Sequence, residues 1–131
     1  MIVVDTNVIA YLYLPGPYTA AAEALLLTDG DWAAPVLWRS ELRNILSTYL
    51  RKSLLALEDA YRIQREAEAL MADREYEVDS LDVLQLAQAS GCSAYDCEFV
   101  VLARRLGTAL ITRDAKLRQA FVDDTRALAR I

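Results

Sequence analysis

The first seven residues constrain the fold more than any other stretch of the chain. Ile2, Val3 and Val4 form a short, wholly apolar, β-branched run. A run of this length fits a strand that is buried on both faces, as in a parallel sheet. The run stops at Asp5, and open parallel sheets bind ligands beyond the carboxyl ends of their strands. Asp5 is therefore a candidate site residue, although an aspartate in this position is more often a turn former or a helix N-cap.

The size and composition of the chain indicate one folded domain, residues 1–131, because 55% of its residues are hydrophobic. No apolar run approaches the length of a membrane span, and the N-terminus has no signal-peptide pattern. We therefore expect a cytoplasmic protein with no membrane association. The net charge of −5 is weak evidence about nucleic acid. Basic domains are the usual binders, but clustered carboxylates that hold cations reverse the local field.

The chain contains no histidine. This absence excludes Ser-His and Cys-His catalysis, HExxH zinc sites and imidazole general bases. Cys92 and Cys97 have no histidine or second cysteine pair to complete a zinc site, so we expect two reduced thiols. Any catalysis must use carboxylates, a thiol, hydroxyls, lysine or a bound metal.

Apolar periodicity and turn residues predict an alternation of strands and helices along the whole chain. This alternation is typical of an α/β fold, and we expect a three-layer sandwich with a central, mostly parallel sheet. The expected strands cover residues 2–4, 32–34, 76–78, 108–112 and 127–131, and the expected helices cover residues 8–14, 19–28, 37–52, 57–74, 80–89, 93–106 and 116–121.

Four acids from distant segments are expected to meet at one edge of this sheet. The helix from Asp96 to Gly107 rises about 15 Å, and the strand that follows it returns by about 17 Å. Asp96 and Asp114 should therefore lie at the same edge. Asp5 ends its strand at that edge if the strands are parallel, and Glu41 begins the helix that leaves the second strand.

Each acid also has an ordinary structural interpretation. Ser93 and Asp96 fit the N-cap and N3 positions of a capping box with Asp in place of Glu. Asp114 fits the N-cap of the following helix. Glu41 fits a surface glutamate in the first turn of its helix.

If the four acids do meet, their charges must be neutralised by protons or cations. Oxygen ligands without histidine or thiolate suit Mg²⁺ or Mn²⁺. A bound metal activates water and neutralises a phosphoryl group, so hydrolysis of a phosphodiester is the natural reaction class. Four nearby cations are candidates for contact with a nucleic-acid backbone, although each also fits a solvated surface position: Arg39, Arg43, Arg113 and Lys116.

At these residues the sequence resembles PIN-domain ribonucleases, and in particular the VapC-like toxins of toxin–antitoxin pairs. The resemblance runs from Met1 to about Leu117, while the segment after Phe121 matches poorly. It rests on four motifs: Asp5-Thr6-Asn7, Arg39-Ser40-Glu41, Ser93-Ala94-Tyr95-Asp96 and Thr112-Arg113-Asp114.

This resemblance implies specific roles for the motif residues. It implies RNA as the substrate, a homodimer and a neutralising antitoxin protein as partner. The residues that would bind Mg²⁺ or Mn²⁺ are Asp5, Glu41, Asp96 and Asp114. The residues that would support them with polar groups are Thr6, Asn7, Ser93 and Thr112.

Three other interpretations compete with this one. A receiver domain would need paired acids after the first strand and a lysine after the fifth, and an aspartyl phosphatase would need Asp at position 7, where this chain has Asn7. The serious alternative is a PIN fold that binds protein without catalysis. Apolar residues between Tyr11 and Leu14, with Trp38, Leu54 and others, exceed an obvious core need, which indicates either an interface or simply core.

Overall fold

The structure is a computed structural model that describes residues 1–129. Its centre is a five-stranded sheet in the order β3-β2-β1-β4-β5, in which every neighbouring pair is parallel. The chain starts in the middle of the sheet, proceeds outward to β3 and returns to the other side of β1 with β4. The strands are β1 (Ile2–Val4), β2 (Trp32–Pro35), β3 (Glu75–Tyr76), β4 (Leu110–Ile111) and β5 (Thr125–Arg126).

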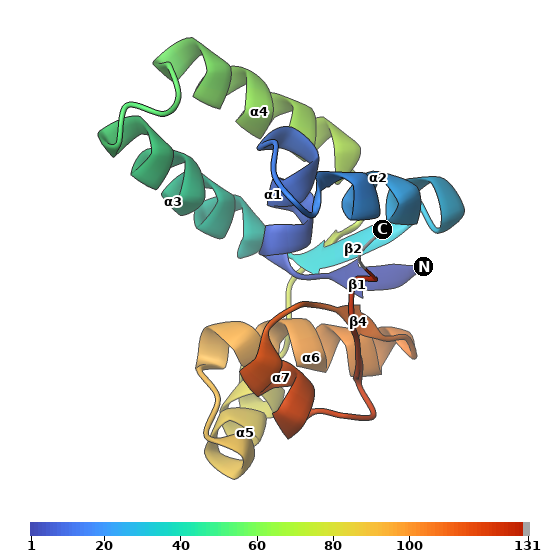
Figure 1. The fold of residues 1–131 in the computed structure, drawn as a ribbon. Coiled ribbons are helices and arrows are strands. Elements are labelled where there is room, and N and C mark those ends of the chain that lie inside the picture. The colour runs from blue at the N-terminus through green and yellow to red at the C-terminus, as the bar shows by residue number, and fades with distance from the viewer. Residues whose placement is uncertain (130–131) are drawn as a thin grey trace.

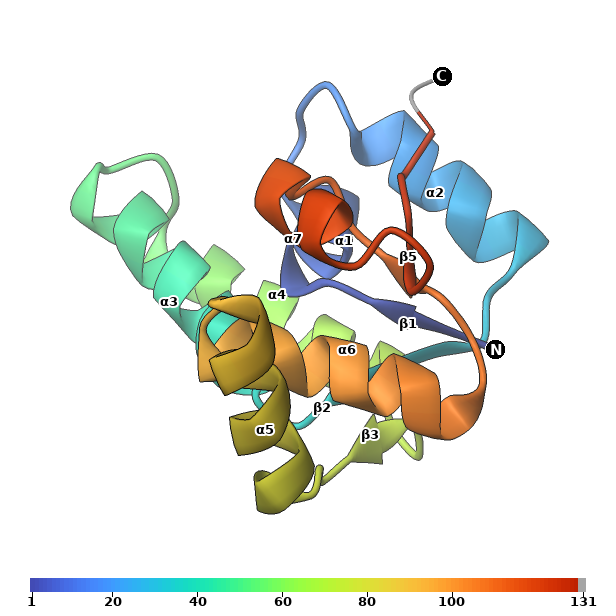
Figure 2. The same ribbon diagram turned by 90° about the horizontal axis from the view of Figure 1, so that it is seen from below.

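Seven helices of the described residues cover the two faces of the sheet (Figure 1). The first four lie on one face, and α3 and α4 form a hairpin that extends beyond the sheet. The other three lie on the opposite face, where α6 packs against β1, β2 and β4 (Figure 2). The helices are α1 (Thr6–Tyr13), α2 (Thr19–Thr28), α3 (Trp38–Arg51), α4 (Leu57–Leu70), α5 (Ser80–Ser90), α6 (Ala94–Leu106) and α7 (Ala115–Ala120).

The expected three-layer α/β architecture with a parallel sheet is therefore confirmed. All three residues of β1 are buried, as expected for a strand covered by helices on both faces. Trp32 and Trp38 are fully buried on and just after β2. No helix among residues 1–129 combines the length and the apolar character needed to cross a membrane.

The expected last strand over residues 127–131 is wrong. The strand β5 lies earlier, where Thr125 pairs with Leu110 and Arg126 with Ile111 of β4. Residues 127–129 form no regular element, and residues 130–131 lie outside the described part of the chain. Leu128 is buried without strand pairing. The apolar residues around Leu128 therefore reflect burial of this segment and not strand formation.

Several expected boundaries also differ. The helix expected to continue to residue 74 ends at Leu70, and Asp73 then adopts a left-handed φ of 69° that a continuing helix does not allow. The first helix begins at Thr6 rather than at residue 8, because Asp5 occupies its N-cap position. These differences of a few residues do not move the candidate acids away from the edge of the sheet.

A partly buried network joins β3 to the start of α3. The Glu75 carboxylate accepts hydrogen bonds from Trp38 Nε1 at 2.8 Å and from Arg39 Nε and Nη2 at 2.6 and 2.7 Å. The hydrogen bonds from Arg39 lower the pKa of Glu75 despite the opposing effect of burial. A carboxyl whose folded pKa is lowered stabilises the fold above its unfolded pKa, and this stabilisation is lost as the pH falls through the folded value.

We expect Glu75→Ala to lower the free energy of unfolding by about 1–3 kcal/mol, because it leaves the buried indole N–H of Trp38 without its acceptor. Glu75→Gln keeps one acceptor and should cost less. Urea unfolding at pH 7 measures both, with Glu77→Ala as a control at an exposed glutamate of the same segment. An unfolding free energy of Glu75→Ala within about 0.5 kcal/mol of wild type would contradict the role of this network.

Candidate active site

The site begins where β1 and β4 end side by side. Asp5 follows β1, and its backbone N–H donates to the carbonyl of Ile111. Asp5 takes the N-cap position of α1, but its side chain makes no capping hydrogen bond. The Asp5 Oδ2 atom instead accepts a hydrogen bond of 2.7 Å from the hydroxyl of Thr112, which follows β4. The carboxylate is therefore held across the sheet edge rather than used to start a helix.

A second acid reaches this edge from α3. The Thr6 hydroxyl, at the first position of α1, donates to Glu41 Oε1 at 2.7 Å. Glu41 is half-buried in the first turn of α3. Asn44 lies one helical turn further along the same face and also lines the site. The sequence interpretation missed Asn44, although its spacing of three residues from Glu41 could have indicated it.

The remaining two acids stand at helix N-termini of the opposite layer. The Ser93 hydroxyl accepts a hydrogen bond from the backbone N–H of Asp96 at 3.1 Å and caps α6. Asp114 caps α7 through Oδ1, which accepts from the N–H of Leu117 at 3.0 Å. The Thr112 hydroxyl also accepts from the N–H of Asp114 at 3.1 Å. Asp96 and Asp114 therefore belong to the capped first turns of their helices and also line the candidate site.

These side chains surround one pocket of about 230 Å³. It lies beyond the carboxyl ends of β1 and β4, which are neighbours at the topological switch point of the sheet. Ligands usually bind at this point in open α/β sheets. The lining combines all four candidate acids with amide and hydroxyl groups: Asp5, Thr6, Asn7, Glu41, Asn44, Ile45, Asp96 and Asp114.

Burial and mutual repulsion disfavour charge on these acids. The pKa of Asp5 is raised chiefly by burial, against the lowering effect of Thr112, and further by the charges of Asp96 and Asp114. Burial likewise raises the pKa of Glu41, with Asp5 and Asp96 adding to the effect. The pKa of Asp96 is also raised, first by burial and then by Asp114. The acids therefore sense one another's charge across the pocket.

The predicted basic residues divide into two groups. Lys116 lies near enough to Asp96 to lower the pKa of that carboxyl, and Arg113 directly precedes Asp114. Arg39, in contrast, is committed to Glu75 and to Glu68, the latter at 3.1 Å.

Arg43 is exposed on α3 and donates to the Ser40 hydroxyl and to the carbonyl of Arg39. It does not line the acidic pocket. None of the four basic residues lines the acidic pocket, but Lys116 lies near enough to influence Asp96, and Arg113 is next to Asp114 in the chain.

The donor set of the pocket fits a hard divalent cation, since every charged ligand is a carboxylate. Within residues 1–129, however, no three acidic, cysteine or histidine side chains converge closely enough to form a ready metal-binding cluster. Two of the carboxylates, Glu41 and Asp5, accept hydrogen bonds from the hydroxyls of Thr6 and Thr112. The two observations are compatible, because Mg²⁺ keeps several waters and is commonly bound through only one or two carboxylates.

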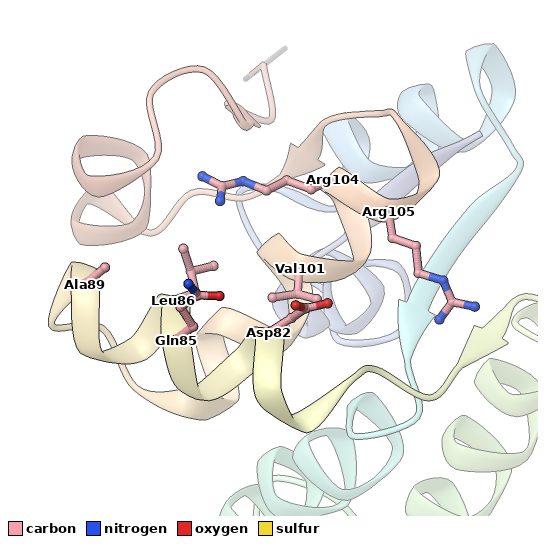
Figure 3. A pocket seen from close by; sticks show the side chains of 7 residues that line it. All are labelled: Asp82, Gln85, Leu86, Ala89, Val101, Arg104 and Arg105. Atoms are coloured by element: carbon pink, nitrogen blue, oxygen red, sulfur yellow. The ribbon is translucent and has the colours of Figure 1, made fainter.

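A larger pocket lies elsewhere, between α5 and α6 (Figure 3). Its volume is about 660 Å³, but Asp82 is the one acid among the seven side chains that line it. Two arginines border it, and both are already engaged: Arg104 with the Asp124 carboxylate and Arg105 with the carbonyl of Glu77. The smaller acidic pocket, which four acids line, is therefore the better candidate for chemistry.

Comparisons with known proteins identify the family of the chain. A family model described as PIN domain matches residues 2–121. Ribonuclease VapC3 of Pyrobaculum aerophilum is 31% identical over 124 residues, which cover 92% of this chain and 94% of that protein.

Solved structures agree in fold. PAE2754 from Pyrobaculum aerophilum superposes with a TM-score of 0.77 at 21% identity, over 97% of this chain and 90% of that chain. A chain of a toxin-antitoxin complex from Klebsiella pneumoniae gives a TM-score of 0.73 at 17% identity, with 100% of both chains covered. The family match and the sequence similarity together show that the chain belongs to the PIN-domain family and is a relative of Ribonuclease VapC3.

Proposed function

We propose that this protein is a Mg²⁺- or Mn²⁺-dependent endoribonuclease that hydrolyses phosphodiester bonds of RNA. The observation that carries the proposal is the single pocket lined by four carboxylates from four separate segments of the chain. Carboxylate ligands without histidine suit a hard divalent cation, and such a cation supplies an activated water for hydrolysis of a phosphodiester. The similarity to Ribonuclease VapC3 supports RNA as the substrate.

Each residue has a role that follows from its position. Asp5, Glu41, Asp96 and Asp114 would hold the cation, one or two of them directly and the others through its bound waters. When bound, the cation supplies water activation and charge neutralisation at the phosphate. Thr112 and Thr6 orient the carboxylates of Asp5 and Glu41 by donating hydrogen bonds to them. The side-chain amides of Asn7 and Asn44 are positioned to donate to water or to phosphate oxygens.

We further propose that the protein is the toxin of a toxin–antitoxin pair, that it forms a homodimer and that it acts in the cytoplasm. The similarity in fold to a chain of the Klebsiella pneumoniae toxin-antitoxin complex supports an antitoxin partner. An apolar groove of about 220 Å³ between α3 and α4, lined in part by the exposed Leu57 and Tyr61, offers a surface for a partner's apolar segment. The alternative, a PIN fold that binds protein without catalysis, gives no reason for four acids around one pocket.

Cleavage of RNA is the first test. We expect the purified protein to cleave single-stranded or loop RNA with Mg²⁺ or Mn²⁺ and to lose this activity in excess chelator. Asp5→Asn should lower the cleavage rate about 100-fold or more, because it removes a charged ligand at the centre of the site. Asp73→Asn is a matched control at an exposed turn position whose left-handed backbone suits Asn. Equal cleavage in chelator and in Mn²⁺ would show that the metal mechanism is wrong.

The charge repulsion in the pocket gives a second prediction, on stability. A raised folded pKa means that the folded state binds protons more readily, so stability falls as the pH rises from the unfolded toward and past the folded value. In chelator at pH 7, Asp96→Asn should therefore melt at or above the temperature of wild type. The difference should close as the pH is lowered through the raised pKa values, because the wild-type acids then become neutral.

Added Mn²⁺ shows whether the acids bind a metal together or only repel one another. Millimolar Mn²⁺ should raise the melting temperature of wild type, since a ligand that binds only the folded state stabilises it by about 2.7 kcal/mol at 100 times Kd. The double variant Asp5→Asn/Asp96→Asn should respond much less. An equal Mn²⁺-induced shift in both proteins would mean that these acids are not the metal site.

A further inference from the structure

Arg113 is exposed beside the acidic pocket, yet its orientation is fixed by two tyrosines. Its guanidinium lies over the ring of Tyr18, with Cζ 3.3 Å from the ring centroid. It also donates hydrogen bonds to the hydroxyls of Tyr18 and Tyr11, the latter at 3.4 Å. The two tyrosine rings lie 5.4 Å apart. Because three side chains from α1, the α1–α2 loop and the segment after β4 support one another, Arg113 presents its charge with little remaining freedom.

A second pocket begins on the other side of Arg113. Its volume is about 360 Å³, and it lies between α7 and the segment that follows β5. Its lining is Arg113, Ala115, Arg118, Gln119, Ala127 and Leu128. Arg113 is joined directly to Asp114, which lines the acidic pocket. The two pockets are therefore joined through the consecutive residues Arg113 and Asp114.

The two charged side chains that line this second pocket are both arginines. Among residues 1–129, no carboxylate lies within ion-pair distance of Arg113 or Arg118. Arginines without a carboxylate partner also occur elsewhere on the surface, but Arg113 and Arg118 line one pocket together. In a chain of net charge −5, two arginines without a carboxylate partner around one polar pocket mark a place for an anion.

We infer that this pocket, bordered by Arg113 and Arg118, is a subsite for a nucleotide of single-stranded RNA next to the phosphodiester that is cleaved. The inference rests on the proposed ribonuclease function. A pocket of this volume is large enough for one nucleotide. The two guanidinium groups bind backbone phosphates, and the exposed face of Arg113 offers a stacking surface to a base. Gln119 supplies both a donor and an acceptor for a base edge.

Single-stranded RNA is favoured over a duplex by the combination of groups. Cationic side chains interleaved with aromatic rings are the usual means of binding unpaired strands. Duplex RNA is read across a wide, shallow groove by its shape and its hydroxyls, and a recessed pocket does not match that surface. The acidic pocket repels phosphates in its metal-free state, so the adjacent cations also draw the strand to the site.

The salt dependence of binding tests the subsite independently of cleavage. The assay is fluorescence anisotropy of a labelled single-stranded RNA of about 12 nucleotides in Mn²⁺, with Asp5→Asn as the parent protein so that the RNA stays intact. Each phosphate contact contributes about 0.7 to the slope of log K against log salt for a single strand. We expect Arg113→Gln and Arg118→Gln each to reduce this slope by about 0.7 and to weaken binding about 3- to 10-fold at low salt.

Two further variants sharpen the assay. Arg65→Gln removes a charge from the exposed surface of α4, in the other helical layer, and should change neither the slope nor the affinity. Tyr18→Leu keeps every charge but removes the ring under Arg113, and should weaken binding about 2- to 5-fold. A duplex of the same length should bind the parent more weakly than the single strand.

The outcomes separate the subsite from the proposed function. Unchanged slopes in Arg113→Gln and Arg118→Gln, or a parent that does not bind the single strand, would overturn the subsite even if wild type cleaves RNA. Flattened slopes support the subsite, and they do so even if wild type fails to cleave in Mn²⁺, a result that would count against the ribonuclease alone. An equally large loss of RNA affinity in Arg65→Gln would show that the effect depends only on net charge. That result would also overturn the subsite.

Discussion

The parallel pairing of β1 with β4 is the interaction on which the rest of the site depends. These strands are separated by more than a hundred residues, and their register sets Val4 beside Ile111. That register brings the Thr112 hydroxyl within 2.7 Å of the Asp5 carboxylate and leaves Asp114 and Arg113 just beyond it. A slip of one residue would turn Thr112 to the other face and remove the hydrogen bond. The site is therefore a direct consequence of strand pairing, with α3 and α6 adding Glu41 and Asp96 from the two helical layers.

The acids that the proposed function requires also lower the stability of the metal-free fold. Three acids of the pocket have raised pKa values because burial and neighbouring carboxylates disfavour their charge. Hydroxyls from Thr112 and Thr6 offset part of this cost. The fold tolerates the remainder because its core is extensive, with β1 and both tryptophans enclosed. The arginines also differ in their surroundings. Arg39 is paired with Glu75, whereas Arg113 and Arg118 have no carboxylate partner among residues 1–129.

Sequence reasoning reached the fold and the meeting of the four acids because both follow from simple geometry. A helix and a strand of similar length return the chain to one edge, which brought Asp96 and Asp114 together. It failed where tertiary contacts decide. Leu128 is buried without strand pairing, so the last strand was misplaced. Arg39 was grouped with the RNA contacts because its partner Glu75 is 36 residues away, on a strand too short to predict well. The contacts of Tyr11 and Tyr18 with Arg113 could not be predicted from the sequence either, because they depend on tertiary packing.

The central claim is that four carboxylates from distant segments form one cation site. The most direct test is a crystal structure of the protein grown with Mn²⁺, with data collected at the manganese absorption edge. We predict an anomalous difference peak inside the pocket, in contact with oxygens of the carboxylates that line it: Asp5, Glu41, Asp96 and Asp114. Crystals of Asp5→Asn/Asp96→Asn grown in the same way should lack that peak. A peak at another position, or a peak of equal height in the double variant, would contradict the account.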